Sequence, residues 1–327
     1  MNVIDIHTHM MSDSWLALLK RHGAPHYSIG PIKGGYDAIH EKGAPFLTLT
    51  PGMFDYGVRF KAMDKAGVDL AVISLTCPSV YWGSADVSAN AARVINNDMR
   101  SAQTAHPDRI RYLATLPWQY PELAIDELAR ACDAGAVGVM VLANIRGMHL
   151  TDPPLAPIWK AIDARSLPVL VHPTNPPGHG DMDLMKYNLI ATVGFVYDTT
   201  LAVTRMVMDG FFDRFPNVKI IAAHGGGTIP YINARIDKFH EMMANSREKI
   251  SNSPTSYFQR IHYDAAVYQD NALRACIDLA GPSHVLYGSD YPHVTGDMPG
   301  CLARVNALPA DQRDAIRGGN ARRLFGI

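Results

Sequence analysis

The 327-residue sequence predicts one (β/α)8 barrel, an α/β fold in which parallel strands alternate with helices. Eight short apolar runs are the first observation, and most are continuous in Val, Ile, Leu and Ala, as in parallel strands buried on both faces. Amphipathic stretches with helical spacing separate the runs. The length suits either two domains or one large barrel, and because we find no internal repeat, low-complexity segment or linker, we expect a single barrel domain over residues 1–327.

The predicted strands share a short length and an apolar centre. They are residues 3–9, 70–75, 109–116, 136–142, 167–173, 218–226, 261–267 and 284–292. The predicted helices lie between them. In residues 121–135, apolar side chains recur every three or four positions, and residues 58–67 and 155–166 behave similarly. Gly67 and Gly135 follow the ends of two such stretches, where a left-handed residue commonly terminates a helix.

One region departs from this alternation. Residues 22–56, after the first strand, are rich in Gly and Pro. In a barrel, an insertion at this place can cover the mouth of the active site. We therefore expect a lid-like insertion at about 22–56.

Composition limits the class of protein. The formal net charge is -1, which gives no reason to expect nucleic acid or a membrane surface as a partner. Hydrophobic residues make up 47% of the chain, without a run long enough to span a bilayer. The N-terminus enters a strand directly and does not resemble a signal peptide. The four cysteines, at 77, 132, 276 and 301, form no CxxC pair, so we expect free thiols and a cytoplasmic protein.

Metal-ligating side chains stand at the ends of several predicted strands. His7 and His9 end the first strand and share one face of it, His172 ends the fifth, His224 the sixth, and Asp290 the eighth. Each histidine alone is more typical of a core or loop position. A barrel, however, brings these ends to one rim, where unpaired imidazoles and a carboxylate are costly to desolvate. One divalent cation bound by these side chains would offset the desolvation free energy. Zn²⁺ suits N/O ligands best, with Mn²⁺ or Co²⁺ as alternatives.

The other histidines differ in their expected places. His293 follows Asp290 closely and is expected to face the mouth, and His179 lies in a Gly/Pro-rich loop that can approach it. The rest are interpreted as surface or loop residues: His22, His26, His40, His106, His149, His240, His262 and His284. The glycines at 225–227 permit backbone angles closed to other residues. They indicate either an anion site at the start of a helix or simply a tight turn.

The strand-end pattern resembles the amidohydrolase superfamily. The segments "VHP", "RFPNVKIIAAHGGGTIPYINARID", "VLYGSDYP" and "VRFKAMDKAGVDLAVIS" are similar to the branch around aminocarboxymuconate-semialdehyde decarboxylase, and the similarity covers essentially the whole chain. The resemblance implies His7, His9, His172 and Asp290 as ligands of a single metal ion, without an organic cofactor. It also implies that His224 hydrogen-bonds a water on the metal and moves protons. It further implies a homodimer.

Two positions depart from the branch. Leu47 stands where its members have an arginine that binds a substrate carboxylate, and Ala191 stands in place of a tryptophan. Related hydroxybenzoate decarboxylases also have a glutamate in the strand-six block, where this chain has glycine. Another cation must therefore meet the substrate, and the candidates are Arg59 and Arg235, the latter in the partner's site, together with His293.

The sequence thus predicts a metal-dependent, non-oxidative decarboxylase of an unsaturated or aromatic carboxylic acid, as in the catabolism of aromatic compounds. The metal stabilises the charge left by departing CO2, and Asp290 or His224 delivers a proton. The alternative is a metal-dependent hydrolase of a small ester, lactone or amide, since the same ligands serve both. A hydratase and a non-enzymatic metal-binding protein are more distant alternatives.

Overall fold

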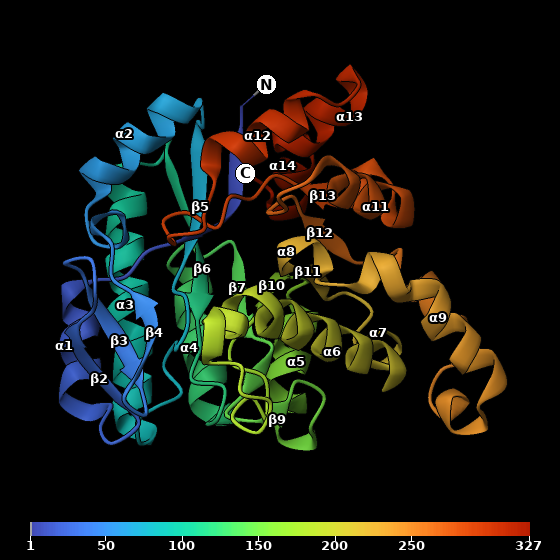
Figure 1. Ribbon diagram of the computed structural model, residues 1–327, viewed down its shortest axis with the longest axis horizontal. Coiled ribbons are helices and arrows are strands. Elements are labelled where there is room, and N and C mark those ends of the chain that lie inside the picture. Colours follow the sequence, from blue (N-terminus) through green and yellow to red (C-terminus); the bar gives the residue numbers. More distant parts are fainter. Residues whose placement is uncertain (1) are drawn as a thin grey trace.

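The computed structural model describes residues 2–327, and its centre is a barrel of parallel strands (Figure 1). The strands of the barrel pair in chain order: β1 (Ile4–His9), β5 (Leu70–Ser74), β6 (Ile110–Thr115), β7 (Gly138–Leu142), β10 (Pro168–His172), β11 (Lys219–Ala222), β12 (His262–Asp264) and β13 (Val285–Leu286). Each lies within one of the eight predicted runs. The (β/α)8 prediction is confirmed.

The barrel closes through the chain that follows β13 rather than through β13 itself. The Ile6 amide donates to the Tyr287 carbonyl at 3.0 Å, and the His9 amide to the Tyr291 carbonyl at 2.7 Å. In return the amides of Ser289 and Asp290 donate to the His7 carbonyl, at 3.2 and 2.8 Å. This closure brings the end of the chain against the HxH strand.

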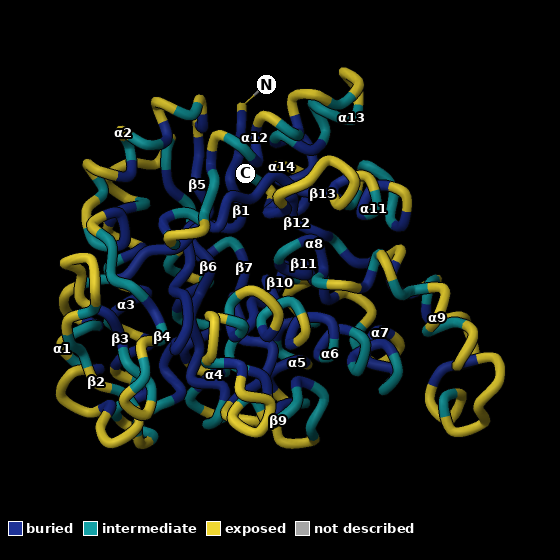
Figure 2. Tube along the Cα trace, in the orientation of Figure 1, coloured by how far each residue is buried: buried dark blue, intermediate teal, exposed yellow. Residues whose placement is uncertain are grey.

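Helices surround the barrel, and Figure 2 shows the strands as the buried layer inside them. They are α1 (Asp13–His22), α2 (Tyr56–Ala66), α3 (Ala85–Ala105), α4 (Pro121–Asp133), α5 (Ala156–Ala164), α6 (Phe195–Met208), α7 (Phe211–Arg214), α8 (Ala223–Gly226), α9 (Ile229–Met242), α10 (Pro254–Phe258), α11 (Asp270–Ala280), α12 (Met298–Asn306), α13 (Ala310–Asp314) and α14 (Asn320–Phe325). Within residues 2–327, no helix has the length and hydropathy that a bilayer crossing requires.

Local sequence explains where α2 begins and ends. The Asp55 carboxylate accepts the amides of Gly57 and Val58, at 2.7 and 3.2 Å, and caps the first turn. Gly67 ends the helix with φ 76°, the left-handed conformation expected from the sequence.

The segment after β1 contains a small antiparallel sheet that the sequence did not predict. Its strands are β2 (Tyr27–Pro31), β3 (Asp37–Glu41) and β4 (Ala44–Thr48). The sheet contacts the loop after β10 through a hydrogen bond from Asn175 Nδ2 to Glu41. Beyond it, the Thr50 hydroxyl donates to the Pro292 carbonyl at 3.0 Å. The insertion is therefore tied to two loops at the carboxyl ends of the strands.

Candidate metal centre

Three histidines from two strands turn the same ring nitrogen toward one point. His7 and His9 lie on one face of β1, with ring centroids 5.0 Å apart, and His172 ends β10, with its ring centroid 4.7 Å from that of His9. All three are buried. They meet because β1 and β10 end at the same rim of the barrel.

The outer nitrogen of each ring is held by a hydrogen bond. Nδ1 of His7 donates to Asp264 at 2.5 Å, Nδ1 of His9 faces the Ser74 hydroxyl at 3.2 Å, and Nδ1 of His172 donates to the Pro173 carbonyl at 2.8 Å. The acceptor oxygens beside His7 and His172 assign a proton to Nδ1 of each ring, whereas the Ser74 hydroxyl can accept from His9 or donate to it. Metal-ligating histidines are commonly oriented in this way.

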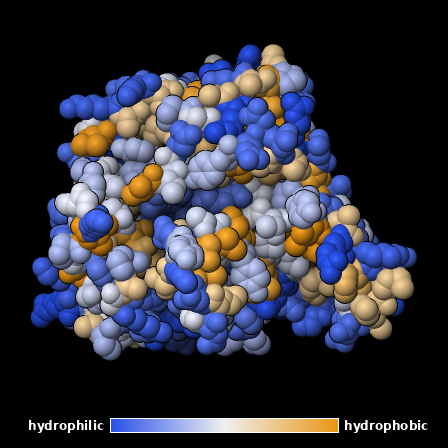
Figure 3. Space-filling view, viewed as in Figure 1, coloured by the Kyte–Doolittle hydropathy of each residue, from blue (hydrophilic) through white to orange (hydrophobic). Residues whose placement is uncertain are grey.

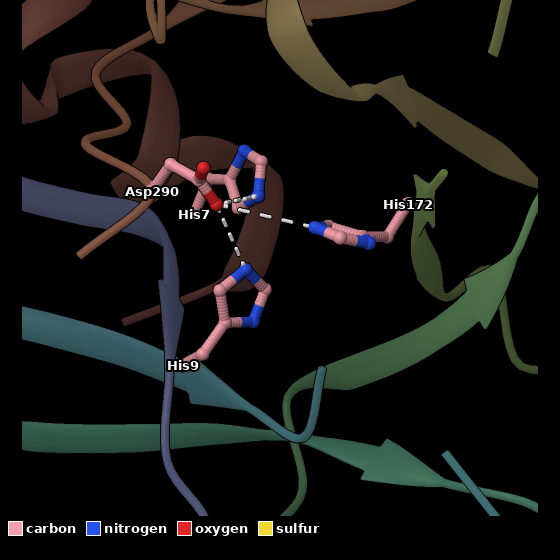
Figure 4. A group of neighbouring side chains, drawn as sticks. All are labelled: His7, His9, His172 and Asp290. Carbon is pink, nitrogen blue, oxygen red and sulfur yellow. Dashed lines mark hydrogen bonds and ion pairs between the residues drawn. The ribbon is translucent and has the colours of Figure 1, made fainter. Parts of the chain in front are cut away.

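The Asp290 carboxylate completes the cluster (Figure 4). Its Oδ1 lies 3.3 Å from Nε2 of His7, 3.2 Å from Nε2 of His9 and 4.0 Å from Nε2 of His172. The four ligand atoms all lie within 4.8 Å of one another. Ligands about 2.05 Å from a tetrahedral zinc ion are roughly 3.3 Å apart, so the spacing fits a divalent cation.

The unpaired atoms of the cluster also fit a cation. Nε2 of His7 and Nε2 of His172 are buried and have no hydrogen-bond partner within residues 2–327. Buried lone pairs that face a carboxylate oxygen are destabilising, and a cation at their centre satisfies all of them. These residues therefore fit the predicted metal ion.

Electrostatics acts differently on the three histidines, and favours the neutral, metal-binding form of His9 and His172 only. Burial lowers the pKa of His9, and lowers the pKa of His172 to about 4, so both imidazoles stay neutral as metal binding requires. Burial opposes charge on His7 as well, but the Asp264 and Asp290 carboxylates outweigh it and raise its pKa to about 10. Burial likewise opposes charge on Asp290, yet the surrounding histidines hold its pKa well below the usual range.

His224 lies beside the four ligand atoms and outside their set. Its Nε2 is 3.5 Å from Oδ2 of Asp290. The other carboxylate oxygen, Oδ1, is the one that faces His7, His9 and His172. Its backbone is left-handed, with φ 54°, and Gly225, Gly226 and Gly227 continue in that region. A side chain at Gly227 would lie 2.3 Å from the Val196 carbonyl oxygen, so glycine is required there.

Asp264 is a site residue that the sequence analysis missed. It ends β12, and its carboxylate binds His7 Nδ1 as well as the amides of His224 and Gly225, at 3.0 and 2.9 Å. One buried carboxylate therefore orients both a ligand and the turn that carries His224. The available signal was its place at the end of a predicted strand, the same signal that identified His172 and His224.

His293 lies at the same rim. Its Nε2 is 3.1 Å from the Thr76 hydroxyl, just beyond β5, and its ring centroid is 4.9 Å from that of His9. The expectation that it faces the mouth agrees with this position.

Arg59 is placed differently from the expected contact with substrate. Its side chain is fully buried behind β1. It donates from Nη1 to the Thr8 hydroxyl at 2.7 Å, from Nη2 to the His9 carbonyl, and from Nε to Met10 Sδ at 3.2 Å. The Tyr291 ring covers it, 5.0 Å from the guanidinium carbon. All three nitrogens are thus bound to the end of the HxH strand.

The remaining predicted positions lie farther out. Arg235 is exposed on α9, where its guanidinium carbon is 4.9 Å from the Phe239 ring centroid, and α9 extends away from the barrel in Figure 1. Leu47 is buried in β4, opposite Ile39. Ala191 is half-buried in a π-helical turn (Ile190–Gly194) before α6.

Comparisons with known proteins identify the family of this chain. The family model described as Amidohydrolase matches residues 4–327. A 2-amino-3-carboxymuconate-6-semialdehyde decarboxylase of Dictyostelium discoideum is 29% identical over 99% of this chain and 91% of its own length. A gamma-resorcylate decarboxylase of Polaromonas sp. is 28% identical over 82% of this chain and 86% of its own.

Solved structures give the same result for the fold. The crystal structure of 5-carboxyvanillate decarboxylase from Sphingomonas paucimobilis superposes with a TM-score of 0.88 at 26% identity, covering 100% of this chain and 99% of that one. A dihydroxybenzoic acid decarboxylase from Polaromonas sp., with bound manganese and 2-nitroresorcinol, has a TM-score of 0.81 at 23% identity, covering 100% and 97%. At that identity the second likeness shows the fold alone.

Proposed function

We propose, from the premise that this chain belongs to the amidohydrolase family, that it is a metal-dependent decarboxylase of an aromatic or unsaturated carboxylic acid. The observation that carries the proposal is the buried cluster of His7, His9, His172 and Asp290, with His224 beside it. The two relatives described above are decarboxylases, and each aligns with more than four-fifths of this chain.

The four ligands would hold one divalent cation, for which we propose Zn²⁺, with Mn²⁺ and Co²⁺ as alternatives. When bound, the cation supplies positive charge where negative charge develops on the substrate as CO2 leaves. The Nδ1 bonds of the three histidines keep the ligand lone pairs aimed at that point. Their pre-orientation matters because stabilisation of a transition state requires charges that are already in place.

The reaction requires a proton as well as a charge. The bond from the carboxyl carbon to the substrate breaks, its electron pair stays on the substrate carbon, and a proton must replace the lost CO2. We assign this proton to His224 Nε2, which lies 3.5 Å from Oδ2 of Asp290. Asp290 thus faces the ligand lone pairs with one oxygen and the proton donor with the other. His293, whose ring centroid is 4.9 Å from that of His9, is the proposed substrate contact.

The first experiment measures product and metal together. The protein purified with zinc should contain about one equivalent per chain and release CO2 from an aromatic acid panel without oxygen or an organic cofactor. Incorporation of ¹⁸O from water into esters, lactones or amides, without CO2 release, would support the hydrolase instead. His172→Ala should lose both metal and activity, whereas His284→Ala should keep both, because His284 precedes β13, at the end of the strand opposite the cluster. Full activity without metal contradicts the proposal.

We further propose a homodimer in which Arg235 reaches the partner's site. Its support is the apolar surface around Arg235. Tyr231 is 90% exposed and Met242 62% exposed on α9, and Phe239, whose ring lies against the Arg235 guanidinium, is 46% exposed. Such side chains are typical of surfaces that another chain covers. The exposed α9 is plain in Figure 2.

A mixing experiment tests the shared site. Arg235→Ala and His224→Asn should each be inactive, and hybrid dimers contain one site in which both residues are intact. Mixing should therefore restore part of the activity. If activity stays absent although subunit exchange is demonstrated, the site is not shared.

Two further assignments complete the proposal. The four cysteines are free thiols, which supports a reducing compartment such as the cytoplasm. The insertion that contains β2, β3 and β4 is proposed to act as a lid, because it is bound to the loops after β10 and β13.

A further inference from the structure

A cavity of about 430 Å³ lies between the insertion and three loops at the carboxyl ends of the barrel strands. Its volume is in the range of small-molecule sites. The lining includes Thr174, two residues after the ligand His172, and Leu142, which pairs with His172 across β7 and β10. The cavity therefore adjoins the metal-bearing part of the rim. Figure 3 shows this face of the molecule hollowed near its middle.

Arg146 is the arginine of this cavity, which the exposed Lys42 also lines. The Arg146 side chain is exposed, and its guanidinium has no hydrogen bond or ion pair within residues 2–327. It occupies the turn of a hairpin between β8 (Asn144–Ile145) and β9 (Met148–His149). A substrate carboxylate needs a cationic partner. Leu47 carries no charge, and the Arg59 guanidinium is already bound to β1. Arg146 can supply that charge from this cavity.

The hairpin holds Arg146 in an unusual conformation. Arg146 has φ 56° and Gly147 φ 87°, the two positive values of a type I′ turn. Asn at the first of these positions is favoured, and arginine there is strained. The turn is anchored by Asn144, whose Oδ1 accepts the Gly147 amide at 2.9 Å and whose Nδ2 donates to Asp198 at 3.1 Å. A rigid, strained turn thus presents a free guanidinium.

We propose that this cavity binds the non-reacting end of the substrate and that Arg146 selects acids with a second carboxylate. The Arg146 guanidinium can make two hydrogen bonds to one carboxylate, and the rings of Tyr27 and Trp82 line the cavity and suit a planar molecule. This inference rests on the proposed function, because it assigns the far end of the same substrate. It makes Arg146 a specificity residue and gives it no part in the chemical step.

The experiment measures binding, without turnover, to the zinc-loaded protein. Isophthalate and benzoate differ by the second carboxylate, and calorimetry gives the ratio of their dissociation constants. The wild-type protein should prefer isophthalate by roughly 10- to 100-fold, the range of a hydrogen bond to a charged group. Arg146→Asn should abolish the preference. Asparagine is chosen because Asn-Gly favours the type I′ turn, so the hairpin stays folded when the charge is removed.

Two controls separate charge from structure. Arg146→Lys should retain part of the preference, and Arg274→Met, an exposed arginine on α11, should retain all of it. An unchanged ratio in Arg146→Asn, or an equal loss in Arg274→Met, overturns the inference. A protein that binds isophthalate through Arg146 but releases no CO2 from any acid contradicts only the proposed function. A decarboxylase whose preference survives Arg146→Asn contradicts only the role of Arg146.

Discussion

Replacing Asp264 by asparagine should weaken the metal site without removing any of its ligands. The carboxylate accepts four hydrogen bonds. Oδ2 receives His7 Nδ1 and the His224 amide, and Oδ1 receives the amides of Gly225 and Ala266, at 2.9 and 3.1 Å. An amide group has nearly the same shape but only one acceptor oxygen. One pair of donors must therefore face the new NH2 group.

Either orientation of the new amide disturbs the site. If NH2 faces His7, the ring can accept from it only by moving its proton to Nε2, which removes the lone pair that a metal ion needs. If NH2 faces Gly225 and Ala266, the turn that carries His224 loses two hydrogen bonds. Loss of the residue that orients a metal-ligating histidine typically costs 10- to 100-fold in metal affinity, about 1.4–2.8 kcal/mol.

Competition with a chelator at fixed pH measures that change. We expect Asp264→Asn to bind zinc roughly 10- to 100-fold more weakly than wild type. Asp209→Asn is the matched control, because Asp209 accepts a comparably short bond, from Thr151 at 2.5 Å, away from the ligand cluster. Nitrogen-15 spectra of labelled histidine report the tautomer of His7 directly. A zinc affinity within twofold of wild type, with full activity, would refute the role of Asp264.

Two other substitutions test neighbouring residues. His224→Asn should keep the metal and lose activity by roughly 100-fold or more, the scale of general acid catalysis; metal analysis beside turnover checks this, and loss of the metal would make His224 a ligand. Arg59→Met should lower the free energy of unfolding of the metal-loaded protein by about 2–4 kcal/mol, because the Thr8 hydroxyl and His9 carbonyl lose their buried donor. Urea unfolding measures it, with Arg274→Met expected within about 0.5 kcal/mol of wild type.

The barrel was predictable because each strand has a local signal. Apolar runs, helical spacing and glycines such as Gly67 identify elements without reference to the rest of the chain. The small sheet of β2, β3 and β4 was not predicted, because its strands are short, lie in a segment rich in Gly and Pro, and are ordered by pairing with one another. The run at 284–292 was too long as a strand: regular pairing ends at Leu286, and the residues beyond it close the barrel against β1.

The metal cluster was predictable because a barrel brings the carboxyl ends of its strands to one rim. The place of His7, His9, His172 and Asp290 at or after strand ends is enough to predict that they lie together. Residues that act through contacts between distant segments had no such signal. Asp264 binds His7 across 257 positions of sequence. Arg59 has the pattern of an ordinary helical residue, and only the packing of α2 against the rim shows that its guanidinium supports β1.

Backbone strain links the proposed metal ligands to His224, the proposed proton donor. Asp290 and His224 are both left-handed, with φ 57° and 54°, a conformation that non-glycine residues keep only when their surroundings enforce it. The Asp290 amide is held by the His7 carbonyl at 2.8 Å, and the His224 amide by Asp264, which also binds the His7 ring. Both strained residues thus depend on His7 and its carboxylate partner. A change that moves His7 should therefore displace the ligand oxygen and the proton donor together, which is why Asp264→Asn is expected to reduce turnover even at saturating zinc.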